Sequence, residues 1–375
     1  MAKEVRNIST RTSSFVWGRA AGRCQFDGCN RPLWKSLVTQ EGMNAAERAH
    51  IYSFREGGPR GHEGLDESTL NDNENLMLVC HQCHELIDQD RNGKQYSAGL
   101  LQGWKRAHEA RIELVSGIIP NKRSNVVLYG ANIGQHSAPL SREATLPALF
   151  PSRYPASDVP IELGMHNSSW RDRDQEFWRV EDVNLIRQYE RKVQAALAAG
   201  DVTHLSVFGL APQPLLIRLG SLLTDIVDVD VYPLLREPKG WGWDDTATEL
   251  DYCVTPPSTK GAPALVLSLS GTILPERVER TLGSPVSVWH VSLAQPHSDA
   301  LRSRQHLRRL RETLRKLLDE IKATHEGRPL SIFPAMSVAA AVELGRVRMP
   351  KADMPWRIYD EVSALGGFVL ALEIR

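Results

Sequence analysis

The stretch Asn75–His84, NLMLVCHQCH, decides the fold of the first third of this 375-residue chain. An apolar run leads directly into Cys80 and Cys83, which have two residues between them, and a second close pair, Cys24 and Cys29, lies upstream. Each short spacing lets two sulfurs converge on one ion from a single turn. Because the N-terminus lacks the apolar core of an export signal, the four cysteines predict a structural zinc site rather than disulfides.

Composition bounds the class of protein and the number of domains. Hydrophobic residues make up 42% of the chain and charged residues 24%, which is typical of globular proteins and not of disordered chains. No run of about 18 apolar residues occurs, so we expect no membrane-spanning helix and a cytoplasmic protein. A chain of 375 residues is too long for one ordinary core, so we expect two domains.

The formal net charge is zero, so an electrostatic argument for nucleic-acid binding has to be local. In residues 1–35, Lys and Arg clearly outnumber the two acidic residues, Glu4 and Asp27. Such a basic arm suits contact with phosphates, and a solvated terminus is the alternative interpretation. The fifth cysteine, Cys253, stands alone, and we expect a small buried hydrophobic residue.

Hydrophobic patterning divides the chain into two parts. The first, residues 1–120, is predicted to contain a short helix from residue 14, a helical stretch over 40–47, a strand over 49–54 and a closing helix over 98–116. Repeated prolines follow, and we place a linker at 121–144. The second part, residues 145–375, alternates apolar strands with helices, which indicates largely parallel sheets.

Two segments of the second part are alike. FGLAPQPLLIRLGSLL and FPAMSVAAAVELGRV each give an apolar strand, an Ala/Pro loop and a helix expected to end in Leu-Gly. This internal similarity predicts a duplicated fold with two equivalent halves. A basic helix is expected over about 302–321, where a solvated face is favoured over a surface for DNA or a neighbouring subunit.

The order His50, Asn75 and Cys80-x2-Cys83-His84 is similar to that of HNH nucleases, which have a ββα-metal fold, and the resemblance covers about residues 20–110. It implies that His50 is the general base for water, because a neutral imidazole can take a proton near neutral pH. It implies that His84 binds a catalytic divalent cation, Mg²⁺ or Mn²⁺. A helix cap or a substitute zinc ligand is the alternative for His84.

The same resemblance gives Asn75 the role of holding the loop and orienting His50, with metal contact also open. Many HNH proteins have an aspartate immediately before the base, where this chain has Ala49, so the expected metal shell is incomplete and Glu47 or water would have to complete it. The zinc, enclosed by four sulfurs, is expected to stabilise the fold and not to catalyse.

No catalytic constellation occurs after residue 120, so a binding role is expected there. The motifs VFGLAPQPLLIRLGSLL, LVLSLSGTI and IFPAMSVAAAVELGRVRMPKADMPWRIYD resemble a SAVED domain, a fusion of two CARF-like Rossmannoid halves. With the first part, the chain resembles HNH–SAVED effectors of CBASS anti-phage systems. This implies that a cyclic oligonucleotide, expected to be a cyclic dinucleotide, drives assembly into a homo-oligomer, a dimer or tetramer, that degrades double-stranded DNA with little sequence preference.

Ligands of open α/β sheets lie at the carboxyl ends of strands, where loops and helix N-termini offer N–H groups to phosphate. The candidate residues lie in three such loops, and tryptophans could stack on a purine. They are Gly209, Ala211, Pro212, Gln213, Ser270, Gly271, Phe333, Pro334 and Ala335, with Trp241, Trp243 and, less directly, Trp289. Ordinary turns and core tryptophans are the alternative interpretation.

Two other functions remain open from the sequence. One is a modification-dependent or site-specific restriction endonuclease, whose second domain would read DNA and which would need no nucleotide. The other is a non-enzymatic binding protein that uses the zinc module as a scaffold, and its function would survive His50→Ala.

Overall fold

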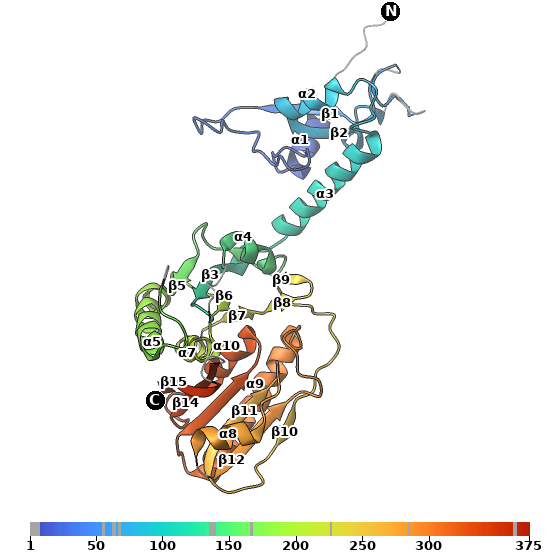
Figure 1. The fold of residues 1–375 in the computed structure, drawn as a ribbon. Helices are drawn as coiled ribbons and strands as arrows, with labels where there is room; N and C mark the ends of the chain where they lie inside the picture. Colours follow the sequence, from blue (N-terminus) through green and yellow to red (C-terminus); the bar gives the residue numbers. More distant parts are fainter. Residues whose placement is uncertain are drawn as a thin grey trace, which may run out of the picture. The chain divides into compact units, whose positions relative to one another are not determined.

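The computed structural model describes residues 8–54, 57–61, 65–66, 69–134, 140–165, 168–225, 227–283, 285–362 and 366–375. The chain divides into two compact units, Met1–Ile119 and Pro120–Arg375. Figure 1 shows the elements of each unit. Within the described residues, no helix is both long enough and apolar enough to cross a membrane.

The first unit is built on one antiparallel strand pair followed by a helix. Strand β1 (Ala46–His50) pairs with β2 (Leu76–Cys80) in a register that sets His50 opposite Leu76. Helix α2 (His81–Gln89) follows β2 without a loop and contacts both strands. The other elements are α1 (Thr10–Arg19), η2 (Asn73–Asn75) and α3 (Ala98–Ser116). This ββα order is the one expected from the sequence.

The helix predicted over residues 40–47 is wrong. Residues 46 and 47 belong to β1, and the segment before them carries a bridge between Lys35 and Gly42. Pairing with β2 accounts for the difference, because hydrogen bonds to a partner strand override a weak local helix preference.

The second unit contains two sheets. The first has the order β4-β3-β6-β7, with β5 also paired to β3, and all of these pairs are parallel. Its strands are β3 (Arg123–Gly130), β4 (Tyr154–Pro155), β5 (Ile161–Leu163), β6 (Leu205–Leu210) and β7 (Val229–Tyr232). Its helical segments are η3 (Pro120–Lys122), α4 (Arg142–Thr145), η4 (Leu146–Leu149), α5 (Gln175–Tyr189), η5 (Glu190–Gln194), α6 (Ala195–Ala198) and α7 (Gln213–Leu223).

The second sheet has the order β10-β12-β11-β13-β14-β15, parallel at its centre and antiparallel at both edges. Its strands are β10 (Cys253–Thr255), β11 (Ala262–Ser268), β12 (Val286–Ser292), β13 (Leu330–Ala335), β14 (Trp356–Val362) and β15 (Gly367–Ile374). Its helices are α8 (Pro275–Leu282), α9 (Arg304–His325) and α10 (Val338–Val347). A hairpin of β8 (Leu234–Arg236) and β9 (Lys239–Trp241) forms a separate two-stranded sheet.

Two α/β halves, each with its own sheet, confirm the predicted fold class. The halves meet where α7 packs against α10. A Cβ on Gly220 would overlap the carbonyl oxygen of Val342, and a Cβ on Gly345 would overlap that of Ile217. These two glycines are the Leu-Gly glycines of the similar segments, so the internal similarity marks the contact between the halves.

The linker predicted at 121–144 needs correction. Its residues 123–130 form β3, which pairs with β4, β5 and β6 in the first sheet. The apolar run VVLY at 126–129 is the signal that the neighbouring prolines obscured. Residues 135–139 of the predicted linker lie outside the described residues.

Cys253 also differs from expectation, because its side chain is exposed. It begins β10, which is an edge strand of three exposed residues. An edge strand has a neighbouring strand on one side only, so a cysteine at this position need not be buried.

Candidate active site and metal centre

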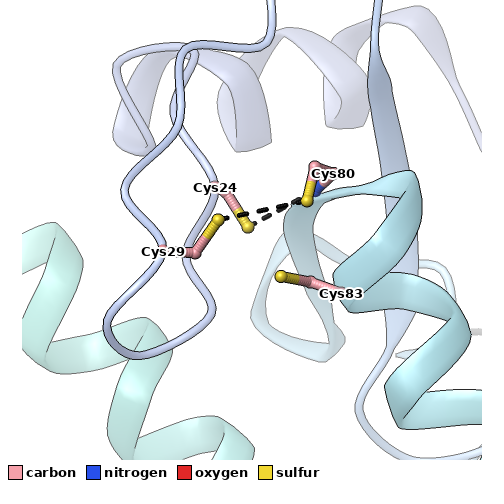
Figure 2. A group of neighbouring side chains, drawn as sticks. All are labelled: Cys24, Cys29, Cys80 and Cys83. Carbon is pink, nitrogen blue, oxygen red and sulfur yellow. Dashed lines mark hydrogen bonds between the residues drawn. The ribbon is translucent and has the colours of Figure 1, made fainter.

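Four cysteine sulfurs converge in the first unit (Figure 2). Cys24 and Cys29 come from the loop after α1, Cys80 ends β2, and Cys83 lies in the first turn of α2. All four Sγ atoms lie within 4.8 Å of one another, and those of Cys29 and Cys80 are 4.0 Å apart. In the part of the chain that the structure describes, this is the only such group of three or more His, Cys, Asp or Glu ligands.

The donor set fits zinc. A tetrahedral ion with Zn–S bonds of about 2.3 Å places its sulfurs about 3.8 Å apart, close to the separation of Cys29 and Cys80. The backbone N–H of Cys80 donates to Sγ of Cys24 at 3.3 Å, which is a contact that favours a thiolate. Burial raises the pKa of Cys24 to about 12, so a cation among the sulfurs is what would hold this thiol ionised.

A buried glutamine joins the first cysteine pair to the rest of the unit. The N–H of Gln25 donates to the carbonyl of Leu78, and its side-chain oxygen accepts from the N–H of Leu78 at 2.7 Å. Its Nε2 donates to Glu109 of α3 at 3.1 Å. The loop that carries Cys24 and Cys29 is therefore bonded to the middle of β2. This bond holds the first cysteine pair close to the second, which lies at the end of β2 and the start of α2.

His50 ends β1 and is half-buried. Its Nε2 lies 3.0 Å from the side-chain oxygen of Asn71. An amide oxygen can only accept, so a hydrogen bond across this contact requires the imidazole tautomer that carries its proton on Nε2. The sequence reasoning missed Asn71, because a polar residue in a loop carries no local signal of the side chain it will meet.

Asn75 is 6% exposed, and its amide is bonded on both sides. Its oxygen accepts from the N–H of Tyr52 at 2.7 Å, and its nitrogen donates to the carbonyls of Tyr52 and Leu70 at 3.1 and 2.9 Å. Its own carbonyl accepts from the N–H of Ile51 at 2.8 Å. Asn75 thus holds the two residues that follow His50, and the role in orienting His50 that the family resemblance implied stays a prediction.

His84 lies in the first turns of α2 and is partly exposed. Its Nδ1 lies 3.5 Å from a carboxylate oxygen of Asp88, one turn further along the same helix. A carboxylate at one ring nitrogen orients the other for a ligand, as second partners of metal-bound histidines do. The i, i+4 spacing of His84 and Asp88 could have revealed this pair from the sequence.

Glu47 is poorly placed to replace the acidic residue missing at Ala49. Side chains alternate along a strand, so Glu47 and His50, three residues apart, project from opposite faces of β1. The Glu47 carboxylate instead lies 3.7 Å from Nδ1 of His81, the first residue of α2. His81 is largely exposed.

The basic arm is partly used inside the first unit. Arg19 of α1 forms ion pairs with Glu74 at 2.7 Å and with Glu109 at 2.8 Å. Lys3 and Arg6 lie outside the described residues. In the second unit, Arg304 and Arg309 of the basic helix α9 pair with Asp245 and Glu249. Both stretches are therefore less available to DNA than their sequence suggests.

In the second unit the three candidate loops meet. The carbonyl of Ala335 accepts from the N–H groups of Leu269 and Ser270, both at 2.8 Å. The side chain of Gln213 accepts from the N–H of Met336 at 3.0 Å. The bond between Gln213 and Met336 joins the loop at the start of α7, in one half, to the loop at the start of α10, in the other. The ends of β11 and β13 and the N-termini of α7 and α10 therefore lie together.

The candidate ligand residues differ in exposure. Gln213, Ser270, Gly271 and Ala335 are partly exposed, whereas Gly209, Ala211, Pro212, Phe333 and Pro334 are buried. The ring of Phe333 stacks on Tyr359 with centroids 4.6 Å apart, so it belongs to the core.

The tryptophans also separate into two kinds. Trp241 and Trp243 are partly buried, and Trp241 packs edge-on against Phe208. Trp289 is 6% exposed, and its Nε1 donates to His325 at 3.2 Å. Trp289 is therefore a core residue, and the stacking role considered for it is wrong.

Two family models match the chain. The model described as SAVED, "SMODS-associated and fused to various effectors sensor domain", matches residues 185–374, and the model described as "HNH endonuclease" matches residues 24–91. The second match contains His50, Asn75, His84 and all four clustered cysteines. No curated protein matches the chain.

Two of the similar solved structures are receptors. The Acinetobacter baumannii Cap4 SAVED/CARF-domain containing receptor with the cyclic trinucleotide 2′3′3′-cAAA is 13% identical, with a TM-score of 0.45, and the match covers 82% of this chain and 64% of that one. The Moraxella osloensis Cap4 receptor is 12% identical, with a TM-score of 0.41 and coverages of 78% and 60%. The chain thus spans less than two thirds of the length of either receptor.

Proposed function

Because this chain belongs to the SAVED family and carries an HNH endonuclease domain in the same polypeptide, we propose that it is an effector nuclease whose cleavage of double-stranded DNA is switched on by a cyclic oligonucleotide. The proposal of nuclease activity rests on the imidazole of His50, which lies at the end of β1 in contact with Asn71. Asn71 lies 3.0 Å from its Nε2, and Asn75 holds the backbone beside it.

His50 is the general base of this reaction. With its proton on Nε2, the ring takes a proton from water at Nδ1 as the water attacks the phosphorus of a phosphodiester. His84, oriented by Asp88, together with solvent would hold a divalent cation, Mg²⁺ or Mn²⁺. That cation, when bound, supplies charge stabilisation at the leaving oxygen. The four thiols would hold zinc as a structural ion.

The contacts between the three candidate loops of the second unit support the proposal that this unit binds the nucleotide. Gln213, Ser270, Gly271 and Ala335 lie where the two halves of the second unit meet, beside the N-termini of α7 and α10. N–H groups at such positions suit the phosphates of a cyclic dinucleotide, and Trp241 or Trp243 would stack on a base. A ligand that bridges the two halves would favour one arrangement of them, and association into dimers or tetramers would bring HNH domains onto one duplex.

The test is cleavage of supercoiled plasmid in Mg²⁺, with and without a panel of cyclic di- and trinucleotides, while sedimentation reports the oligomeric state. We expect cleavage and larger assemblies only with an activating nucleotide. His50→Ala should lower the rate at least about 100-fold. His81→Ala, which removes an exposed histidine of α2, is the matched control and should cleave normally.

Each alternative has its own outcome. Equal cleavage with and without nucleotides would remove the switch and favour a restriction endonuclease, especially if the cuts depended on sequence or base modification. Unchanged cleavage by His50→Ala would remove the assignment of the base. No cleavage by the wild type under any condition would leave the scaffold function.

A further inference from the structure

Arg60 holds the chain directly beside the expected base. It lies between β1 and β2 in sequence, and its Nε donates to the carbonyl of Ile51 at 2.7 Å. Ile51 follows His50 and is fully buried, and its N–H is already bonded to the carbonyl of Asn75. The residue next to His50 is therefore fixed at its N–H by Asn75 and at its carbonyl by Arg60.

This contact is kept in spite of several unfavourable features. The backbone of Arg60 has φ +66°, a left-handed conformation that is uncommon for residues other than glycine. Burial lowers the pKa of its guanidinium, and the buried Nη1 has no hydrogen-bond partner in the described structure. Strained and partly desolvated groups of this kind persist where the surrounding structure imposes them, and they cluster at functional sites.

Gly93 is part of what imposes this conformation. A Cβ at Gly93 would lie 2.8 Å from Cγ of Arg60 and 3.1 Å from its backbone nitrogen. Gly93 itself has φ +65°, in the turn after α2. The segment that follows α2 therefore packs directly on Arg60 and leaves no room for a side chain.

Two carboxylates lie close enough to Arg60 to act on its charge. Asp88 of α2 and Asp90, which follows the helix, raise the pKa of the guanidinium and offset part of the effect of burial. Asp88 is also the carboxylate next to Nδ1 of His84. One side chain thus hydrogen-bonds the strand end that carries His50 and packs against Gly93, in the turn after the helix that carries His84.

We propose that Arg60, held in place by Gly93, is a positioning residue for DNA cleavage that fixes the end of β1 relative to α2 and so sets His50 against His84. This proposal rests on the proposed nuclease function. Because Arg60 acts through the backbone beside His50, its loss should change the rate of the chemical step and leave DNA binding nearly intact.

The experiment compares four variants with the wild type in the plasmid assay, with Mg²⁺ and either a cyclic diadenylate or 2′3′3′-cyclic triadenylate as the activator. Arg60→Gln should lower kcat about 10- to 100-fold, with KM for DNA changed less than about threefold. Arg60→Lys should recover part of kcat, because an ammonium can still donate to the Ile51 carbonyl but lacks the planar fork. Gly93→Ala should lower kcat although the guanidinium remains.

Arg91→Gln is the control for the loss of a nearby cation, because Arg91 is exposed and close to Gly93 in sequence. It should behave as the wild type. Zinc content should stay at the wild-type value in all four variants, and the unfolding temperature should fall only in Gly93→Ala, where the added Cβ overlaps Arg60.

A wild-type kcat in Arg60→Gln would overturn the proposal, and so would a change confined to KM, which would indicate a DNA contact instead. If Arg60→Gln loses zinc or unfolds, Arg60→Lys and Gly93→Ala decide the matter, and wild-type kcat in both overturns the positioning role. A wild type that cleaves no DNA removes the proposed function itself, whereas a cleaving wild type with unaffected variants removes only the role of Arg60.

Discussion

At the scale of single residues, the structure separates buried polar groups that are fully bonded from those that are not. The buried side-chain amide of Asn75 bonds the N–H and the carbonyl of Tyr52 and the carbonyl of Leu70, and its main-chain carbonyl accepts from the N–H of Ile51. Glu181 of α5 is the opposite case, since it is fully buried and neither carboxylate oxygen has a hydrogen-bond partner in the described structure. The hydroxyl of the nearby Tyr129 is equally unpartnered. Such a carboxyl is expected to be neutral in the folded protein.

Glu181 predicts a specific dependence of stability on pH. Burial raises its pKa from the ordinary 4.5 to about 7, so the folded state binds this proton more tightly than the unfolded state. The stability linked to it is complete below pH 4.5 and is lost as the pH rises through 7, by about 3 kcal/mol in all. Glu181→Gln should therefore unfold at higher denaturant than the wild type at pH 8 and show little difference at pH 4.5. A variant that is equally affected at both pH values would contradict this.

At the scale of elements, the crossing of α7 and α10 sets how the two halves of the second unit meet. The helices approach so closely at Gly220 and Gly345 that backbone contacts backbone across the crossing. Around the crossing, the buried Glu343 of α10 pairs with Arg311 and Arg346, and Arg346 donates to the carbonyls of Thr224 and Val227. The joined ligand loops lie at the N-termini of these same two helices, so the crossing also fixes their spacing.

The close contact at the crossing predicts that an added methyl group is harmful there and harmless at a helical glycine with open space around it. Gly345→Ala should destabilise the second unit by about 1–3 kcal/mol or more, because the new methyl group overlaps the carbonyl of Ile217. Gly103→Ala in the middle of α3 is the matched control, since its Cβ would meet nothing within 4 Å. It should stabilise its helix by up to about 1 kcal/mol. Denaturant unfolding measures both, and equal effects would contradict the predicted steric cause.

At the scale of the whole molecule, the chain consists of two units with separate cores. The core of the first unit includes three of the four clustered cysteines, with the fourth packed against it. The second unit has one larger apolar cluster and two small ones of its own, and its single cysteine, Cys253, lies outside them on an edge strand. Metal should therefore matter to the folding of one unit and not to that of the other.

Metal removal tests this division. A zinc chelator, or Cys83→Ser, should abolish amide protection over residues 8–119 in hydrogen exchange and leave residues 120–375 protected, because a structural zinc site contributes directly to folding. Elemental analysis should find one zinc per wild-type chain and a loss in Cys83→Ser. Cys253→Ser should keep both the zinc and the protection. Loss of protection in both units together would show that they do not fold independently.

The sequence by itself determined the features that depend on neighbours along the chain. Two short cysteine spacings were enough to predict the cluster of four sulfurs, and the resemblance to HNH nucleases implied the ββα order around it. Alternating apolar strands and helices, together with two similar segments, predicted a duplicated α/β unit.

Only the tertiary structure decided which distant groups meet. It showed that residues 123–130 are a sheet strand and not a linker, that residue 46 begins β1 and not a helical turn, and that Asn71 bonds to His50. It also brought the side chain of Gln213 to the N–H of Met336. The physical reason is that periodicity and spacing are local, whereas a strand partner, a buried hydrogen bond or the room for a Cβ depends on residues far away in sequence.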